Sequence, residues 1–350
     1  MGELSRVMSS KERVLRAYRN EPTDRVPVRI WGIEPETEPP HPSYASIVQA
    51  AKERTDMVAG WGASTGIFMT MSEEVSVHTD DRDSRHEHYR EQHQTYTTPL
   101  GELTMVYAYS PIGKPGYMLK PLLGTPEDVE KLLSIPHVPP RPDVSSFFEK
   151  QERIGDRAAI CVGFGVDAMY ALNSAMGSET FALMSIEQRP LLRRALDMFQ
   201  ERYLDYLGYL LEQGLGPLFG YVGPELCIPP LQSPRDFDEF VVAYDRELSD
   251  LVHRYGGTMW VHCHGRMGPV LKGFVAMEAD ALNPVEPPPM GDVTLAEAKR
   301  RVGDRLALEG NIEVGDFYRV SEEKMRAMVR QAIDEGAPGG GFVLCPTSSP

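Results

Sequence analysis

Segments with the periodicity of buried strands alternate with segments of helical periodicity along most of this chain. Alternation of this kind requires crossover connections, and therefore predicts a parallel sheet covered by helices. Seven or eight such units favour a closed α/β barrel, the (β/α)8 TIM barrel, over an open sheet. At 350 residues the chain fits a single barrel of about 250 residues with insertions. The expected strands are 25–30, 56–60, 158–164, 217–221, one within 256–266, 279–282, 306–310 and 341–345; the main expected helices are 44–54, 190–213, 234–255, 295–301 and 322–335.

The alternation of strand and helix patterns is interrupted between about residues 68 and 123. Alternating Thr, Tyr and Val residues around Thr98-Pro99-Leu100-Gly101 predict a β-hairpin there. We therefore expect one barrel domain over residues 1–350, with an inserted β-hairpin at about 68–123. Pro350 comes just after the last expected strand, so we expect the last helix of a full barrel to be missing.

Charge and cysteine usage exclude several classes of protein. Lys and Arg number 36 against 51 Asp and Glu, a net charge of -15, which argues against nucleic acid or an anionic membrane as partner. The four cysteines lie far apart without CxxC spacing, as in a reduced cytosolic protein. No apolar run of signal-peptide length opens the chain, and no run of about 18 apolar residues occurs. We expect a soluble, cytoplasmic protein.

Polar side chains follow several of the expected strands, where barrel enzymes build their active sites. His262 and His264 lie two residues apart on one strand end, so they share a face and form a two-imidazole clamp, while Cys263 points the other way. Oxygen, nitrogen and sulfur donors together suit zinc better than magnesium or calcium. The candidate residues are Asp167, Glu225, His262, His264, Glu286, Asn311 and Cys345.

Each candidate also has a purely structural interpretation. The two histidines could be core residues bonded to carbonyl groups, and Glu225 could cap the next helix. Cys345 ends an apolar strand and could belong to the core. Glu286 could be a solvated loop carboxylate, and Asn311 could close a turn or bond a substrate. The residues alone leave these alternatives open.

Several segments, taken together, resemble the uroporphyrinogen decarboxylase superfamily, whose fold is the (β/α)8 barrel. The likeness covers nearly the whole chain, from about Lys11 to Pro350. The segments are Lys11–Ala17, Asp24–Val28, the His-x-His-Gly strand end at 262–265, Asn283–Pro288 and Gly340–Leu344.

The resemblance offers two main branches. The true decarboxylases carry an Arg-Gln-Ala-Gly-Arg-Tyr segment just after the first strand, whose arginines hold the carboxylates of the substrate. The corresponding stretch here, 29–36, is acidic beyond Arg29 and would repel a polyanionic porphyrinogen. The other branch consists of zinc-dependent methyltransferases that work with a methylated corrinoid protein.

In the methyltransferase branch, zinc is bound through a His-x-Cys-Gly strand end and a later cysteine. His262 matches the histidine, while His264 stands where the first cysteine should be. The later cysteine falls on Ser348, with Cys345 three places earlier. Imidazole in place of thiolate leaves more positive charge on the metal, which suits a Lewis acid acting on a methyl ether or methylamine.

The resemblance thus implies a zinc-dependent methyltransferase that moves a methyl group between a small methylated compound and a separate corrinoid protein. No Asp-x-His-x-x-Gly pattern occurs in the chain, so the cobalamin is expected on that partner. A homodimer is compatible with the family, although no residue pattern requires one. The expected metal ligands are His262, Cys345, Glu225 and His264, and the residues expected to position substrate are Asp167, Glu286 and Asn311.

Two alternatives remain at this point. The first is a metal-free decarboxylase that acts on a carboxylated substrate through Asp167. The second is a non-catalytic barrel that binds a corrinoid or tetrapyrrole without turnover.

Overall fold

A computed structural model of the chain describes residues 7–349, which form two compact units. The first contains the described residues up to Ala63, Asp143–Val166, and those from Leu207 onward. The second contains Ser64–Pro142 and Asp167–Tyr206. The expectation of one barrel domain over 1–350 stays a prediction. No helix within residues 7–349 has the length and apolar character needed to cross a membrane.

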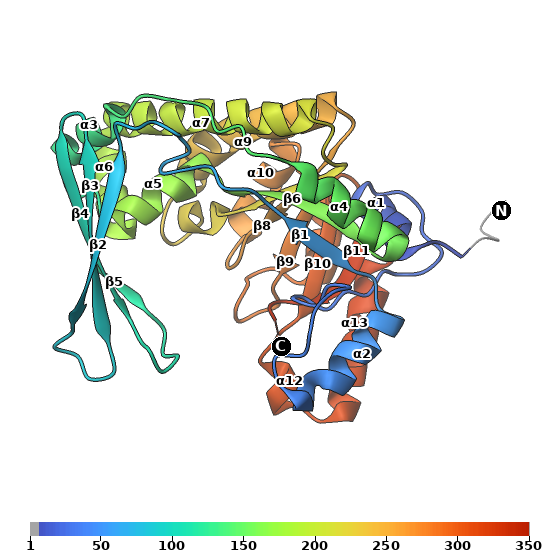
Figure 1. The fold of residues 1–350 in the computed structure, drawn as a ribbon. Coiled ribbons are helices and arrows are strands. Elements are labelled where there is room, and N and C mark those ends of the chain that lie inside the picture. Colours follow the sequence, from blue (N-terminus) through green and yellow to red (C-terminus); the bar gives the residue numbers. More distant parts are fainter. Residues whose placement is uncertain (1–6, 350) are drawn as a thin grey trace. The chain divides into compact units, whose positions relative to one another are not determined.

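The first unit is built on a curled sheet of seven parallel strands that follow their order in the chain (Figure 1). Most of their residues are buried, as expected for strands covered on both faces. The α/β class and the parallel barrel topology predicted from the alternation are confirmed. The strands, in sheet order, are β1 (Val58–Trp61), β6 (Ala159–Val166), β7 (Leu218–Val222), β8 (Thr258–His262), β9 (Ala281–Val285), β10 (Ala307–Ile312) and β11 (Phe342–Pro346).

The strand expected at 25–30 is reduced to a single bridge, which links the two edges of the sheet. Val28 pairs in parallel with Leu344 of β11, and on its other side its carbonyl accepts the backbone N–H of Asp56 at 2.6 Å. The ladder cannot extend because Pro27 has no N–H and because the N–H of Val28 is bound to the Asp56 carboxylate at 3.1 Å.

Helices begin where short polar side chains cap them. Ser9, Thr294 and Ser321 each accept the backbone N–H three residues later, at the starts of α1, α11 and α13. The helix expected over 234–255 is divided by one turn of π-helix (Asp238–Val242). The helices of this unit are α1 (Ser10–Tyr18), α2 (Ala45–Arg54), α4 (Ser145–Ile154), α8 (Pro234–Phe237), α9 (Ala243–Arg254), α10 (Leu271–Ala276), α11 (Leu295–Val302), α12 (Asp316–Arg319) and α13 (Glu322–Gly336).

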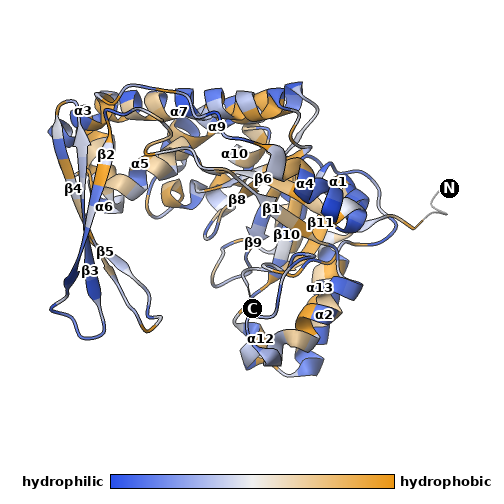
Figure 2. Cartoon of the chain, viewed as in Figure 1, coloured by the Kyte–Doolittle hydropathy of each residue, from blue (hydrophilic) through white to orange (hydrophobic). Residues whose placement is uncertain are grey.

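The second unit contains the predicted hairpin within a four-stranded antiparallel sheet, which has two more strands than the sequence indicated. The turn is where we expected it, since Thr98 pairs with Gly101. Figure 2 shows that β2 and β3 are hydrophilic where the chain turns from one to the other, whereas β11 of the first unit is hydrophobic. The elements are β2 (Ser76–Asp83), β3 (Arg90–Thr98), β4 (Gly101–Tyr109), β5 (Tyr117–Lys120), α3 (Pro126–Leu133), α5 (Ala168–Met176), α6 (Ser178–Glu187) and α7 (Arg189–Glu212), which belongs to this unit up to Tyr206.

Helix α1 packs across the beginnings of the barrel strands. Val14, Ala17 and Tyr18 form one buried cluster with residues near the starts of the strands, among them Val58 and Ala159. This helix therefore covers the amino-terminal end of the barrel and leaves the carboxyl ends of the strands for the functional site.

Arg13 fixes α1 to the barrel through a buried ion-pair network. Its guanidinium lies 2.6 Å from Asp24 and 2.5 Å from Asp56, and its side chain is only 4% exposed. Because Asp24 would lose its ion-pair partner and the buried Asp56 would keep only the partly exposed Arg25, we expect Arg13→Ala to lower the free energy of unfolding by about 3 kcal/mol. Urea denaturation measures this change.

Arg16 on the same helix provides the matched control. Its side chain is 34% exposed and pairs with Glu12 and Glu21 at the surface, so Arg16→Ala should change stability by about 1 kcal/mol or less. Equal losses for the two variants would contradict the anchoring role of Arg13.

Candidate functional site

Two histidines stand together at the carboxyl end of β8. His262 is the last residue of the strand, and the ring centroids of His262 and His264 are 4.6 Å apart at an interplanar angle of 85°. Nδ1 of His262 lies 2.7 Å from Oδ1 of Asn283, and Nδ1 of His264 lies 3.0 Å from Oε1 of Glu286. Because each Nδ1 donates its proton to an oxygen, each Nε2 keeps its lone pair when the ring is neutral.

The surroundings of the two rings favour different protonation states. The hydrogen bond to Glu286 raises the pKa of His264. Burial works against ionisation of Glu286, but the hydrogen bonds from His264 and from the N–H of Gly265 lower the pKa of this carboxyl overall. Burial lowers the pKa of His262 to about 4. His262 is therefore neutral at pH 7 and is suited to accept a proton or bind a cation through Nε2.

Glu225 faces the same group of side chains from the turn after β7. It lies in the short helical turn Pro224–Cys227, and burial raises the pKa of its carboxyl group. The charge of Glu286 also raises this pKa, whereas the charge of His264 lowers it. The Oε2 atom of Glu225 is buried and has no hydrogen-bond partner among residues 7–349. A buried carboxylate oxygen without a partner is destabilising, which points to a functional use.

Glu286 and Asn311 follow or end the next two strands. Glu286 comes directly after β9 and is buried, so it is not the solvated loop carboxylate of the structural alternative. Asn311 lies in β10, and its side-chain N–H donates to the carbonyl of Val285 at 3.2 Å. Its role in positioning substrate stays a prediction.

Cys345 lies with a different set of residues, around the buried carboxylate of Glu309 in β10. Burial, together with the nearby charge of Glu309, raises the pKa of Cys345 well above its usual value. The same carboxylate accepts hydrogen bonds from Tyr18 at 2.6 Å, Trp260 at 2.9 Å and Arg29 at 2.7 Å. The role of Cys345 as a metal ligand stays a prediction.

Glu309 and its hydrogen-bond partners were not among the site residues predicted from the sequence. A sequence signal for Glu309 exists, because this glutamate directly follows the apolar residues 306–308 inside a predicted barrel strand. A buried charge needs a partner from elsewhere in the chain.

Asp167 belongs to the second unit, where it caps a helix. Its Oδ1 accepts the N–H of Tyr170 at 2.5 Å at the start of α5. This contact accounts for an aspartate at that position. A role in positioning substrate stays a prediction.

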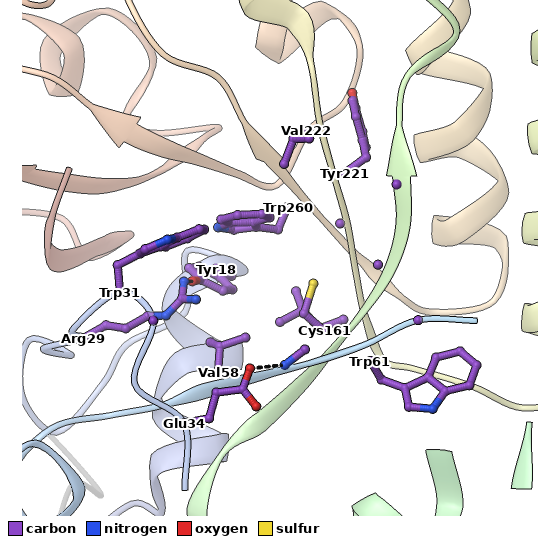
Figure 3. A pocket seen from close by; sticks show the side chains of 17 residues that line it. Tyr18, Arg29, Trp31, Glu34, Val58, Trp61, Cys161, Tyr221, Val222 and Trp260 are labelled. Atoms are coloured by element: carbon purple, nitrogen blue, oxygen red, sulfur yellow. Dashed lines mark hydrogen bonds between the residues drawn. The ribbon is translucent and has the colours of Figure 1, made fainter. Parts of the chain in front are cut away.

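A cavity of about 540 Å³ opens among the strand ends of the first unit (Figure 3). The three tryptophans of the chain, Trp31, Trp61 and Trp260, all line it. The ring of Trp31 also stacks on His262, with centroids 5.1 Å apart and planes 22° apart. The cavity is thus adjacent to the histidine pair through Trp31. No local pattern in the sequence indicated this cavity.

The donor types fit zinc, although the side chains do not converge. Within residues 7–349, no three His, Cys, Asp or Glu side chains are grouped so that they could hold a metal ion. The Nε2 atoms of His262 and His264 and the Oε2 atom of Glu225 are nevertheless donors of the kinds that zinc prefers. Anchoring of Nδ1 by Asn283 and Glu286 is the usual arrangement behind metal-binding histidines.

Comparison with known proteins gives a family match. Residues 97–347 match the family model described as uroporphyrinogen decarboxylase (URO-D). Among curated proteins, a uroporphyrinogen decarboxylase of Pseudoalteromonas translucida is 27% identical over 46% of this chain and 44% of its own length. The methylcobamide:CoM methyltransferase MtaA of Methanosarcina barkeri is 27% identical over 55% of each chain. The chain thus spans about half the length of these two relatives.

A solved structure confirms the fold. A methyltransferase from Methanosarcina mazei superimposes with a TM-score of 0.61, at 17% sequence identity, over 97% of this chain and 93% of the other. At this level of identity, the likeness supports the architecture alone.

The His264–Glu286 pair predicts a change that NMR can measure. In Glu286→Gln, the neutral amide no longer stabilises the imidazolium, so the pKa of His264 should fall. A titration of the ring proton signals would show this. His253, whose pKa is raised by its bond to Asp280, should not move in the same spectra and serves as the internal control. An unchanged pKa of His264 would contradict the pairing.

Glu225 predicts an unusual effect on stability. Glu225→Gln removes a buried charge that has an unpartnered oxygen, so at neutral pH the free energy of unfolding should rise by about 1–3 kcal/mol. Because the folded-state pKa is raised, the gain should disappear as the pH falls below the ordinary pKa of glutamate. Urea denaturation at several pH values measures both effects.

Glu309→Gln is the matched control for Glu225→Gln. It alters a buried carboxylate that has several donors, among them Arg29, and should lower stability by about 3–5 kcal/mol. A loss of similar size in Glu225→Gln would mark Glu225 as a structural residue.

Proposed function

Because this chain belongs to the uroporphyrinogen decarboxylase family, we propose that it is a zinc-dependent methyltransferase of that family. It moves a methyl group between a small methylated compound and a separate corrinoid protein. The match to a relative named methylcobamide:CoM methyltransferase supports this choice. So does the likeness of the His-x-His-Gly strand end to the zinc-binding strand of the methyltransferase branch.

The histidine pair is the observation that carries the proposal. Two imidazoles at one strand end have their Nδ1 atoms bound to Asn283 and Glu286, which leaves both Nε2 atoms for a metal. The candidate ligands are His262, His264 and Oε2 of Glu225, which would have to move closer together to share the ion, because no such group is formed within residues 7–349. When bound there, zinc would supply a Lewis acid that polarises the oxygen or nitrogen carrying the methyl group.

The neighbouring residues orient the two histidine rings and set the protonation state of His262. Glu286 holds the ring of His264 and the proton on its Nδ1, and Asn283 does the same for His262. Burial keeps His262 neutral at pH 7, so no proton has to leave before a metal binds. Trp31 covers one face of His262 and shields it from water.

Cys345 is not needed in this ligand set. Its thiol lies near the buried carboxylate of Glu309, whose charge contributes to its raised pKa. We assign Cys345 to the buried network around Glu309. Asn311 and Asp167 remain candidates for positioning substrate.

Decarboxylation is the second candidate, favoured by relatives named uroporphyrinogen decarboxylase. The charges of the cavity count against it. Among the described residues that line the cavity, only Arg29 is cationic, and Glu309 already lies 2.7 Å from its guanidinium. A substrate with several carboxylates would find no other cationic side chain in the cavity lining.

Zinc content and methyl transfer test the proposal together. Purified protein should contain stoichiometric zinc and should methylate cob(I)alamin, followed by absorbance, with a panel of methyl ethers and methylamines as donors. His262→Ala should lose both properties. Glu286→Gln should lower zinc affinity by about 10- to 100-fold, because it changes the residue that orients a ligand.

His253→Ala is the control, since His253 bonds Asp280 and lies outside the candidate site. It should keep both zinc and activity. Protein without zinc, together with intact methyl transfer in His262→Ala, would overturn the proposal. Carbon dioxide release that a chelator leaves unchanged would favour the decarboxylase, and corrinoid binding without turnover would favour a carrier.

A further inference from the structure

The cavity described above owes its space to glycines at inward-facing positions of the barrel. Barrel interiors are normally filled by bulky branched side chains from every strand. Here the cavity-lining positions of three adjacent strands, β1, β6 and β7, include Gly60, Gly163 and Gly220. Gly163 pairs directly with Gly220, so two neighbouring strands lack side chains at the same level. The interior therefore leaves room for a ligand there.

An aromatic wall faces this space. Trp31 and Trp260 stack with centroids 5.7 Å apart and planes 19° apart, and Figure 3 shows the two indoles side by side along the cavity. A Cβ on Gly220 would lie 2.8 Å from Cε3 of Trp260, so the glycine also allows this ring its position. Flat apolar surfaces of this kind bind planar rings by stacking.

The charges around the wall select against ionic ligands. The guanidinium of Arg29 lies 4.9 Å from the ring centroid of Trp31 and 5.9 Å from that of Trp260. A cationic ligand, such as a methylamine, would be repelled by this charge at the surface where it would otherwise bind. An anionic ligand would find Arg29 already balanced by Glu309.

The second charged group of the lining, Glu34, is engaged as well. It accepts the N–H of Gly60 at 2.9 Å and lies 3.2 Å from Nζ of Lys150. Both charged side chains in the described part of the lining are therefore already paired with a group of opposite charge. Its remaining character is aromatic and aliphatic, through residues such as Val58, Leu218 and Val222.

We propose that this cavity binds an uncharged aromatic methyl ether, with its ring against Trp31 and Trp260. The volume of about 540 Å³ lies within the range of small-molecule sites. The same Trp31 ring that forms the wall stacks on His262, so a ring bound there lies beside the histidine pair. This assignment rests on the proposed methyl transfer for its biological meaning, while the binding itself needs neither zinc nor a corrinoid protein.

Intrinsic tryptophan fluorescence can test the assignment, because the chain has only these three tryptophans. Trp61 donates to Ser146 and packs edge-on against Phe147, and Figure 3 shows its ring directed away from the other two. The variant Trp61→Phe therefore leaves only the indoles of the wall as reporters. Because Trp61 also lines the cavity, the affinity of this variant for each probe is measured beside that of the parent chain.

The probes are 1,2-dimethoxybenzene, its aliphatic analogue 1,2-dimethoxyethane, the anion 3,4-dimethoxybenzoate, and tetramethylammonium. We expect a saturable change in fluorescence with 1,2-dimethoxybenzene and at least about tenfold weaker binding of the other three. Binding of tetramethylammonium or the benzoate with equal or higher affinity would overturn the neutral class. Equal binding of 1,2-dimethoxyethane would overturn the need for a ring.

Filling the cavity gives an independent test. A Cβ on Gly163 would make only an ordinary contact, 3.5 Å from the carbonyl of Trp61, so Gly163→Val fits the strand. It should weaken binding of 1,2-dimethoxybenzene by about 5- to 150-fold without lowering the unfolding midpoint. Gly208→Ala on α7, where an added Cβ meets nothing within 4 Å, is the matched control and should leave affinity unchanged.

Trp31→Leu provides a second variant if Gly163→Val does not fold, and it should weaken binding of the same probe. Unchanged affinity in either folded variant would overturn the assignment of the cavity. Because no zinc or corrinoid enters these measurements, a negative result here leaves the proposed methyl transfer untouched. Conversely, tight binding without any methyl transfer would reject the proposed function alone.

Discussion

The carboxylate of Glu309 is the interaction on which the interior of the barrel depends. It lies fully buried in β10 and accepts hydrogen bonds from three elements. The donors are Tyr18 of α1, Arg29 of the segment that links the sheet edges, and Trp260 of β8. A buried charge persists only when it is paired and hydrogen-bonded. Because its partners come from separate elements, one carboxylate ties together the helix that covers the barrel, the segment that joins its edges, and one indole of the cavity wall.

The same network determines what the cavity can hold. Glu309 fixes both the cation near the wall and the Nε1 atom of Trp260, so the charge of Arg29 is balanced before any ligand arrives. The nearby glycines remove the side chains that would otherwise fill the barrel. The Glu309 network and the glycines of the barrel core together therefore produce a cavity with an aromatic surface on one side and exposed backbone on the other.

The group of side chains around His262 and His264 differs from the Glu309 network, because its polar atoms are not all paired. There, hydrogen bonds orient the two imidazole rings, while Oε2 of Glu225 has no hydrogen-bond partner in the described part of the chain. Proteins keep such groups at functional sites even though they reduce stability. The Glu309 network contributes rigidity, whereas the group of His262, His264, Glu225 and Glu286 provides reactive atoms, and Trp31 contacts both.

The sequence by itself determined the features that follow from local periodicity. Alternating strand and helix patterns indicated the parallel barrel, the turn at residues 98–101 indicated the hairpin, and two-residue spacing put His262 and His264 on one face. These signals are contained in short stretches of chain, where backbone geometry alone sets the direction of side chains. Only the tertiary structure decided that Glu309 meets Tyr18, 291 positions away in the chain, that Cys345 joins that carboxylate, and that the three tryptophans line one cavity. Such contacts depend on how distant elements pack, and no local pattern specifies them.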